Sequence, residues 1–166
     1  MENSDSGPEW RLQATPGVVK SPLTRGFFLM TRLPYLPRPG EVLICNFDDG
    51  GFMPPEMVKR RPVIVVSRKD SHDRYLCTVV PISATEPAAP KIWHHPLPHV
   101  RVPGFEDTEN RWAKCDMIAT VRFERLSKPY RLTNGNGRQY IGVHLHADDL
   151  SAVRECIKHY LLIASA

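Results

Sequence analysis

The chain has 166 residues, a length typical of one domain or of one domain with a tail. Hydrophobic residues make up 42% and charged residues 24%, which is a globular balance, and no apolar run approaches the ~20 residues of a membrane-spanning helix. The net charge of +4 permits an anionic partner such as nucleic acid but does not require one. Sixteen prolines against ten glycines argue against a helical bundle and favour short strands joined by many loops.

The four cysteines, Cys45, Cys77, Cys115 and Cys156, are far apart in the sequence. They form no Cys-x-x-Cys pair, which argues against a zinc ribbon and a thioredoxin-like motif. Their apolar neighbours indicate buried thiols in a reducing compartment, so we expect a cytoplasmic protein. Acidic residues and no continuous apolar stretch at the N-terminus argue against a signal peptide.

Residues 1–38 differ from the rest of the sequence because they carry scattered prolines and no clear period. This composition predicts a disordered N-terminal extension, with Met30 as an alternative natural start. A folded domain is expected over residues 39–166.

Short apolar runs predict the strands of this domain, at residues 41–47, 61–67, 77–83 and 112–121. Residues 84–110 form a long proline-rich loop with one short strand near 92–94, and a loop of this length is usually functional or mobile. The turn sequence Asn134-Gly135-Asn136-Gly137 predicts a hairpin whose second strand covers 139–145. Residues 123–128 are ambiguous and include a candidate helical turn.

A helix is expected at the end of the chain, over roughly residues 148–163. Its apolar residues recur at helical spacing, with Asp148 and Asp149 at its start and Lys158 and His159 near its end. The apolar face is formed by Leu150, Val153, Ile157, Tyr160, Leu161 and Ala164. The whole pattern predicts a mainly β fold, a small barrel or curled sheet with one packed C-terminal helix.

Five segments in order over residues 39–163 resemble the MazF/PemK family of toxins from bacterial toxin–antitoxin modules. No single segment is diagnostic, but their order is fairly specific. The proline-rich loop 54–62 resembles a subgroup of that family. The matching segments are 39–44 with 61–67, then 78–83, 114–119, 126–128 and 145–150.

The resemblance implies an SH3-like barrel with a C-terminal helix, usually dimeric. It also implies a metal-independent endoribonuclease that cuts single-stranded RNA, with no cofactor, and a cognate antitoxin that covers the active groove. RNA supplies its own 2′-OH as nucleophile, so the enzyme must align that hydroxyl and stabilise negative charge on the phosphate.

Arg61 and Ser83 are the candidate catalytic residues. Arg61 matches the arginine of the family's Arg-Pro motif, and its guanidinium fork suits two phosphate oxygens. Proton delivery to the leaving 5′-oxygen is a further candidate role for Arg61. Ser83 ends a predicted strand where the family more often has threonine, so its hydroxyl is expected to donate to a phosphate oxygen. The alternatives are a surface arginine at a strand edge and a serine that caps a turn.

The expected RNA-binding residues surround these two positions. Lys59 and Arg60 extend Arg61 into a basic run that would attract phosphates, although such runs are usually solvated. Glu56 would orient Arg61 or contact a base. Thr85 is an alternative hydroxyl to Ser83. Trp112 is a candidate for stacking on a base and Lys114 for a phosphate contact, with core packing as the alternative for the tryptophan.

Histidines offer a rival mechanism. His94 or His95 in the long loop would serve as general acid or base if the loop covered the groove. His144 and His146 have the spacing of a metal-binding pair on a strand, but no third ligand is near in sequence, so no metal site is expected.

Two other function classes remain open. One is a non-catalytic module of the same fold that binds RNA or an antitoxin. The other is a gyrase poison, which the absence of an aromatic residue in the final four positions disfavours.

Overall fold

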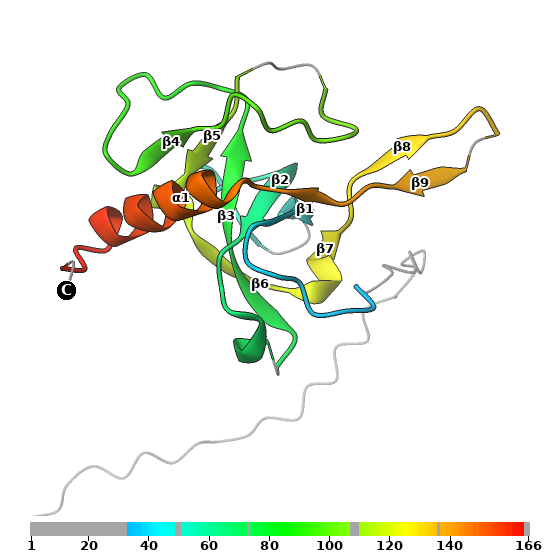
Figure 1. Ribbon diagram of the computed structural model, residues 1–166, viewed down its shortest axis with the longest axis horizontal. Helices are drawn as coiled ribbons and strands as arrows, with labels where there is room; N and C mark the ends of the chain where they lie inside the picture. The colour runs from blue at the N-terminus through cyan, green and yellow to red at the C-terminus, as the bar shows by residue number, and fades with distance from the viewer. Residues whose placement is uncertain (1–32, 49–50, 73, 107–109, 136, 165–166) are drawn as a thin grey trace, which may run out of the picture.

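The computed structural model describes residues 33–48, 51–72, 74–106, 110–135 and 137–164 (Figure 1). These residues form a curled antiparallel sheet with one helix packed against it, which confirms the predicted fold class. The strands are β1 (Glu41–Asn46), β2 (Arg60–Val65), β3 (Leu76–Ser83), β4 (His94–Pro96), β5 (Trp112–Lys114), β6 (Ala119–Arg122), β7 (Leu126–Ser127), β8 (Tyr130–Leu132), β9 (Arg138–Tyr140) and β10 (Val143–His144). The helix is α1 (Ala147–Tyr160), and 3-10 turns lie at Lys69–Ser71, Cys115–Met117 and Phe123–Arg125.

The main sheet has the strand order β10-β1-β2-β3-β5-β4, with β6 also paired to β3 and β7 to β1. The central strands β1, β2 and β3 are rich in buried β-branched residues, as expected for strands covered on both faces. In the β2–β3 pair, Val63 lies opposite Pro81 and Val65 opposite Val79. The strands β8 and β9 form a separate two-stranded hairpin that extends away from the curled sheet (Figure 1).

Side-chain alternation along the central strands produces two hydrophobic clusters, one on each face. The first contains Val42, Ile64 and Val80 and is covered by α1 through Val153 and Cys156. The second contains the residues of β1, β2 and β3 that alternate with these. Leu33, Val121, Phe123 and Leu126, which come from other segments, pack against them. Its buried members are Leu33, Leu43, Cys45, Phe47, Val63, Val65, Cys77, Val79, Val121, Phe123 and Leu126.

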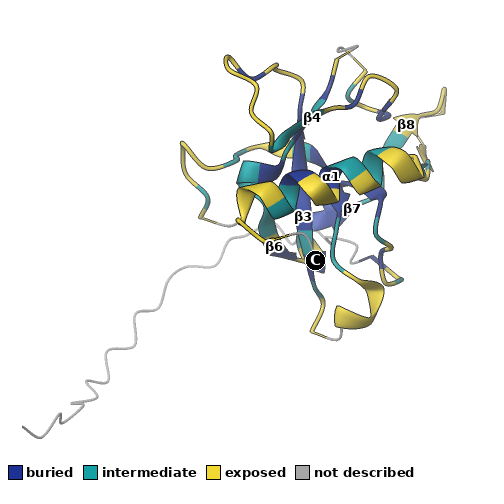
Figure 2. Ribbon diagram, turned by 60° about the vertical axis from the view of Figure 1, so that its left-hand side comes forward, coloured by how far each residue is buried: buried dark blue, intermediate teal, exposed yellow. Residues whose placement is uncertain are grey.

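The helix α1 buries a narrower stripe than its sequence predicts. Val153 and Cys156 are buried, and Ile157 packs partly against the first cluster. Tyr160 and Leu161 are exposed, because the last turn of the helix extends past the strands (Figures 1 and 2).

The single strand predicted over 112–121 is divided in two. Its first part, β5, pairs with the end of β3, where Ser83 lies opposite Trp112. Its second part, β6, pairs with the beginning of β3, where Val79 lies opposite Ala119. A 3-10 turn at Cys115–Met117 joins them, because the chain must change direction to follow the curl of β3.

The hairpin predicted at Asn134-Gly135 is present, with Tyr130 opposite Tyr140. The chain after β9 leaves the hairpin, and β10 adds to the edge of β1 through Val143 and Val42. The ambiguous segment 123–128 divides into a 3-10 turn and the short strand β7.

Residues 33–38, which precede the expected domain boundary at residue 39, contact the folded domain. Leu33 is buried in the second cluster, and the Tyr35 hydroxyl donates a hydrogen bond to the Glu41 carboxylate. Glu41 also accepts from the Arg38 amide, and together these bonds hold residues 35–38 against β1. The predicted disorder of residues 1–32 and the proposed start at Met30 lie outside the described residues.

All four cysteines are buried free thiols, as predicted. Burial raises the pKa of Cys45 and Cys77 to about 12. A helix long and apolar enough to cross a membrane does not occur in the described part of the chain.

Candidate nucleic-acid interface

Arg61 lies near the start of β2, opposite Cys45 of β1. Its Nε donates a hydrogen bond of 2.9 Å to the Val58 carbonyl oxygen, which fixes the guanidinium against the preceding loop. The residue is half-buried, and its two terminal nitrogens make no ion pair with any residue that the structure describes. A guanidinium held at one nitrogen can still present its outer edge to an anion.

Ser83 is at the end of β3, beside the start of β2. Because β2 and β3 are antiparallel, the register that places Val63 opposite Pro81 brings Arg61 and Ser83 to the same end of the two strands and to the same face. The two candidate catalytic residues therefore share one corner of the sheet.

The Ser83 hydroxyl is engaged in a local turn. Its Oγ accepts a hydrogen bond of 3.0 Å from the Thr85 amide and donates one of 3.2 Å to the Thr85 carbonyl oxygen. Ser83 is 7% exposed, whereas the Thr85 side chain lies at the surface. This geometry is that of a serine that caps a turn, which the sequence analysis gave as the alternative to a catalytic hydroxyl.

Trp112 and Lys114 extend the same face across β5. Trp112 pairs with Ser83 on one side and Pro96 on the other, while Lys114 pairs with His94. Both side chains are half-buried. The face that contains Arg61 and Ser83 thus also has an indole and an ammonium group on the neighbouring strand β5.

Lys59 and Glu56 belong to the loop that precedes β2. The Lys59 amide donates to the Asp48 carboxylate at 2.8 Å, and Lys59 has a positive φ of 71°. The Glu56 carboxylate accepts from the Met53 amide at 2.9 Å and closes a turn. Glu56 therefore shapes its own loop, and the orientation of Arg61 comes from the Val58 carbonyl rather than from this carboxylate.

Arg60 and Arg61 are consecutive in β2, so their side chains lie on opposite faces of the strand. Arg60 lies opposite Asn46, so it shares a face with Ile44 and Ile64 of the first cluster. There it lines a cleft of about 590 Å³ together with Ile44 of β1 and residues of two segments farther along the chain. The lining residues are Ile44, Arg60, Pro103, Gly104, Phe105, Glu106, Tyr130, Arg131 and Leu132.

The two loop histidines make different contacts. His95 Nε2 lies 3.1 Å from the Asp149 carboxylate, so this histidine joins β4 to the first turn of α1. His94 Nε2 lies 3.3 Å from an Asp116 carboxylate oxygen, and its Nδ1 accepts from the Lys91 amide. Of the described residues, no three His, Cys, Asp or Glu gather as a metal site.

The family model for the PemK-like, MazF-like toxin of type II toxin–antitoxin systems matches residues 38–161. The chain belongs to this toxin family. The match covers every strand that the structure describes and the whole of α1, including both candidate catalytic residues. The expected subgroup with the loop 54–62 remains a prediction.

Curated relatives of this family member include the protein YifN of Escherichia coli (strain K12). It is 31% identical over 150 residues, and the match covers 78% of this chain and 97% of YifN. A protein of Haemophilus influenzae is 31% identical over 105 residues, covering 57% of this chain and 71% of that protein.

Solved toxins of the family share the fold. The Deinococcus radiodurans MazF structure aligns with a TM-score of 0.52 and 18% identity, over 78% of this chain and 99% of that one. The Mycobacterium tuberculosis toxin MazF-mt6 aligns with a TM-score of 0.51 and 18% identity, over 75% and 99%. At this identity the likeness establishes the architecture alone.

Sequence reasoning missed the cleft because its walls come from three segments distant in the chain. Arg60 starts β2, Phe105 belongs to the long loop, and Tyr130 starts the hairpin. One available signal was the cluster of aromatic and arginine residues on both sides of the Asn134-Gly135 turn, because aromatic and guanidinium planes are groups on which unpaired bases stack.

Proposed function

We propose that this toxin-family member is a metal-independent endoribonuclease that cuts single-stranded RNA and thereby inhibits translation and growth. The observation that carries the proposal is the shared position of Arg61 and Ser83 at one end of β2 and β3. In this role the protein acts in the cytoplasm as a homodimer and is neutralised by a cognate antitoxin.

The proposed reaction needs no nucleophile from the protein. The 2′-oxygen of RNA attacks the neighbouring phosphorus and loses its proton, the bond to the 5′-oxygen breaks, and that oxygen takes up a proton. The products are a 2′,3′-cyclic phosphate and a 5′-OH. Single-stranded RNA is the expected substrate because an A-form duplex holds the 2′-OH out of line.

Arg61 is assigned to the negative charge that develops on the phosphate. Its Nε remains on the Val58 carbonyl, so the outer edge of the guanidinium is preorganised for two phosphate oxygens. Ser83 is assigned to a non-bridging oxygen. Its hydrogen bond to the Thr85 carbonyl is 3.2 Å long, and a phosphate oxygen replaces that acceptor by rotation of the hydroxyl.

The test is cleavage of a long single-stranded RNA by the full chain, purified free of any antitoxin, in EDTA. We expect cuts with 2′,3′-cyclic phosphate and 5′-OH ends, lost in the Arg61→Ala variant. A 2′-deoxy substitution at the cut site is expected to abolish cleavage there. Clean cutting of the deoxy substrate contradicts attack by the 2′-OH. No cleavage of any RNA would instead support the non-catalytic binding module.

A further inference from the structure

A second surface beside the proposed catalytic corner has the composition of a nucleotide-binding site. It is the cleft bounded by Arg60 of β2, Phe105 of the long loop and Tyr130 of the β8–β9 hairpin. Its lining includes the apolar side chains of Ile44 and Leu132. A volume of about 590 Å³ is within the range of small-ligand sites, so the cleft can hold at least one nucleotide.

The cleft is electropositive. Arg60 is an exposed guanidinium on its wall, and it makes no ion pair with any described residue. Arg131 also lines the cleft and is partly neutralised by Glu106, with 3.3 Å between Nε and the carboxylate oxygen. Both members of that pair are more than half exposed, so water screens their attraction and an incoming phosphate can compete for the arginine.

The hairpin supplies a preformed aromatic platform. The rings of Tyr130 and Tyr140 lie 6.0 Å apart in an edge arrangement, and the Arg138 guanidinium lies 4.8 Å from the centre of the Tyr130 ring. Aromatic and guanidinium planes are the groups on which unpaired bases stack. Tyr140 and Leu132 are 53% and 71% exposed, so much of the surface of these side chains is accessible to a ligand.

Position connects the cleft to the catalytic corner. Arg60 and Arg61 are consecutive, and an RNA backbone that contacts Arg61 on one face of β2 needs only to pass around the start of this strand to reach Arg60. We infer that the cleft between β2, the loop at 103–106 and the β8–β9 hairpin binds a nucleotide that flanks the scissile phosphate, with its base on Tyr130 and its phosphate on Arg60. This inference rests on the proposed ribonuclease function.

Binding and cleavage can be measured separately. A fluorescent single-stranded RNA with 2′-O-methyl groups at every position cannot undergo 2′-OH attack, so anisotropy with the full chain reports binding alone. We expect Tyr130→Ala to weaken binding about tenfold, the size of one lost base stack. Tyr130→Phe keeps the ring and is expected to bind like the unmodified protein. Arg60→Gln is expected to reduce the slope of log affinity against log salt concentration by about one, the value for one lost phosphate contact.

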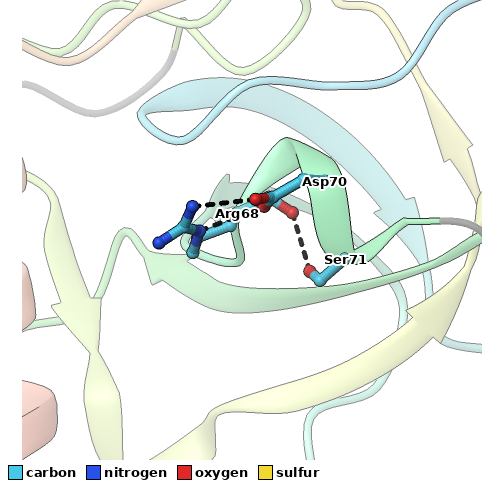
Figure 3. A network of polar contacts seen from close by, with 3 residues as sticks. All are labelled: Arg68, Asp70 and Ser71. Carbon is cyan, nitrogen blue, oxygen red and sulfur yellow. Dashed lines mark hydrogen bonds and ion pairs between the residues drawn. The ribbon is translucent and has the colours of Figure 1, made fainter.

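The matched control is Arg68→Ala. Arg68 lies beyond the other end of β2, where it forms an ion pair of 2.8 Å with Asp70 at the surface, next to Ser71 (Figure 3). It is an arginine outside both the cleft and the catalytic corner, so its loss is expected to leave RNA binding unchanged. Thermal unfolding of every variant shows that a change in binding is not a loss of fold.

A photoreactive RNA locates the base directly. An RNA with 4-thiouridine next to the cut site is expected to crosslink to a peptide that contains Tyr130 or Phe105. The cleft assignment is overturned if Tyr130→Ala and Arg60→Gln bind RNA with normal affinity and the crosslinks lie elsewhere. In that case, cleavage by the unmodified protein still upholds the ribonuclease. Absence of both cleavage and binding in the unmodified protein overturns both proposals.

Discussion

Arg60 and Arg61 are consecutive residues whose side chains lie on opposite faces of β2. Arg60 shares its face with Ile44 and lines the cleft, whereas Arg61 shares its face with Cys45 and donates to the Val58 carbonyl. A basic run that appears continuous in the sequence is therefore divided between the two faces of β2. The two arginines are expected to give different kinetic effects when each is replaced.

The first prediction separates these effects. Arg61→Ala is expected to lower kcat for RNA cleavage by about 10²–10³-fold, because the variant lacks the donors placed for the transition-state charge. Arg61→Lys is expected to recover only part of the rate, since an ammonium lacks the two-pronged geometry. Arg60→Gln is expected to raise KM and leave kcat near its original value, because this residue contributes binding remote from the reacting phosphate.

Steady-state cleavage of a short fluorescent RNA provides both constants. Equal losses of kcat in Arg60→Gln and Arg61→Ala would contradict the division of roles. Circular dichroism and thermal melts serve as the control, because both side chains contribute little to the core and neither variant should unfold.

The second prediction concerns the serine. Ser83→Ala removes both hydrogen bonds to Thr85, so it is expected to lower the free energy of unfolding by about 1 kcal/mol. It is also expected to slow cleavage by at least about tenfold, through the loss of one donor to the phosphate. Ser83→Thr keeps the hydroxyl and is expected to retain activity.

Thr85→Ala is the matched control for Ser83. The Thr85 main chain makes the bonds to Ser83, so this substitution leaves the turn intact. If Thr85→Ala abolishes cleavage while Ser83→Ala does not, the catalytic hydroxyl belongs to Thr85. Cleavage rates and urea unfolding of the two variants distinguish stability from chemistry.

The strands and the helix were predictable because their signals are local. Runs such as Val63-Ile64-Val65 favour buried strands, and residues spaced like Val153 and Ile157 form one face of a helix. The division of 112–121 was not predictable from local sequence. The division arises because the two halves of this segment pair with different parts of the curled strand β3. The residues 112–121 by themselves carry no signal of that curl.

The candidate site was predictable only in part, because some of its residues come together through contacts between distant segments. Arg61 and Ser83 were found through a family pattern, and strand pairing then brings them to one corner. The cleft depends on Phe105 and Tyr130, which lie near Arg60 only when the long loop and the start of the hairpin are brought beside the start of β2. Strand alternation predicts that Arg60 and Arg61 lie on opposite faces of β2. The sequence does not show which residues each arginine meets on its face, because those residues come from other segments of the chain.

The third prediction tests the rival role of the loop histidines. His95 lies on the face of β4 toward α1, where it contacts Asp149. His95→Ala is therefore expected to lower the free energy of unfolding by up to about 1 kcal/mol while RNA cleavage is retained. Asp149→Ala removes the other member of the pair and is expected to have a similar effect. Loss of cleavage in a folded His95→Ala variant would favour a histidine acid or base over the Arg61 mechanism.

The fourth prediction concerns the pH dependence of stability. His72 is fully buried below Phe123, with 5.6 Å between ring centres, and its Nε2 lies 2.7 Å from the Ser67 hydroxyl oxygen. Its Nδ1 has no hydrogen-bond partner among the described residues. Burial lowers the pKa of His72, and the smaller, opposing effect of the exposed Asp70 carboxylate does not cancel it.

Because the pKa of His72 is lower in the folded state than in the unfolded chain, the unfolded state takes up the proton first as the pH falls. The stability that neutral His72 contributes is present above about pH 6.5, the unfolded value, and is lost progressively below it. Thermal melts of the unmodified protein and of His72→Gln between pH 8 and pH 5 are expected to show a steeper fall for the unmodified protein. Glutamine does not titrate, so the difference between the two curves isolates this histidine from the others. Parallel curves would show that His72 has the same pKa in both states and that its burial imposes no cost on its protonation.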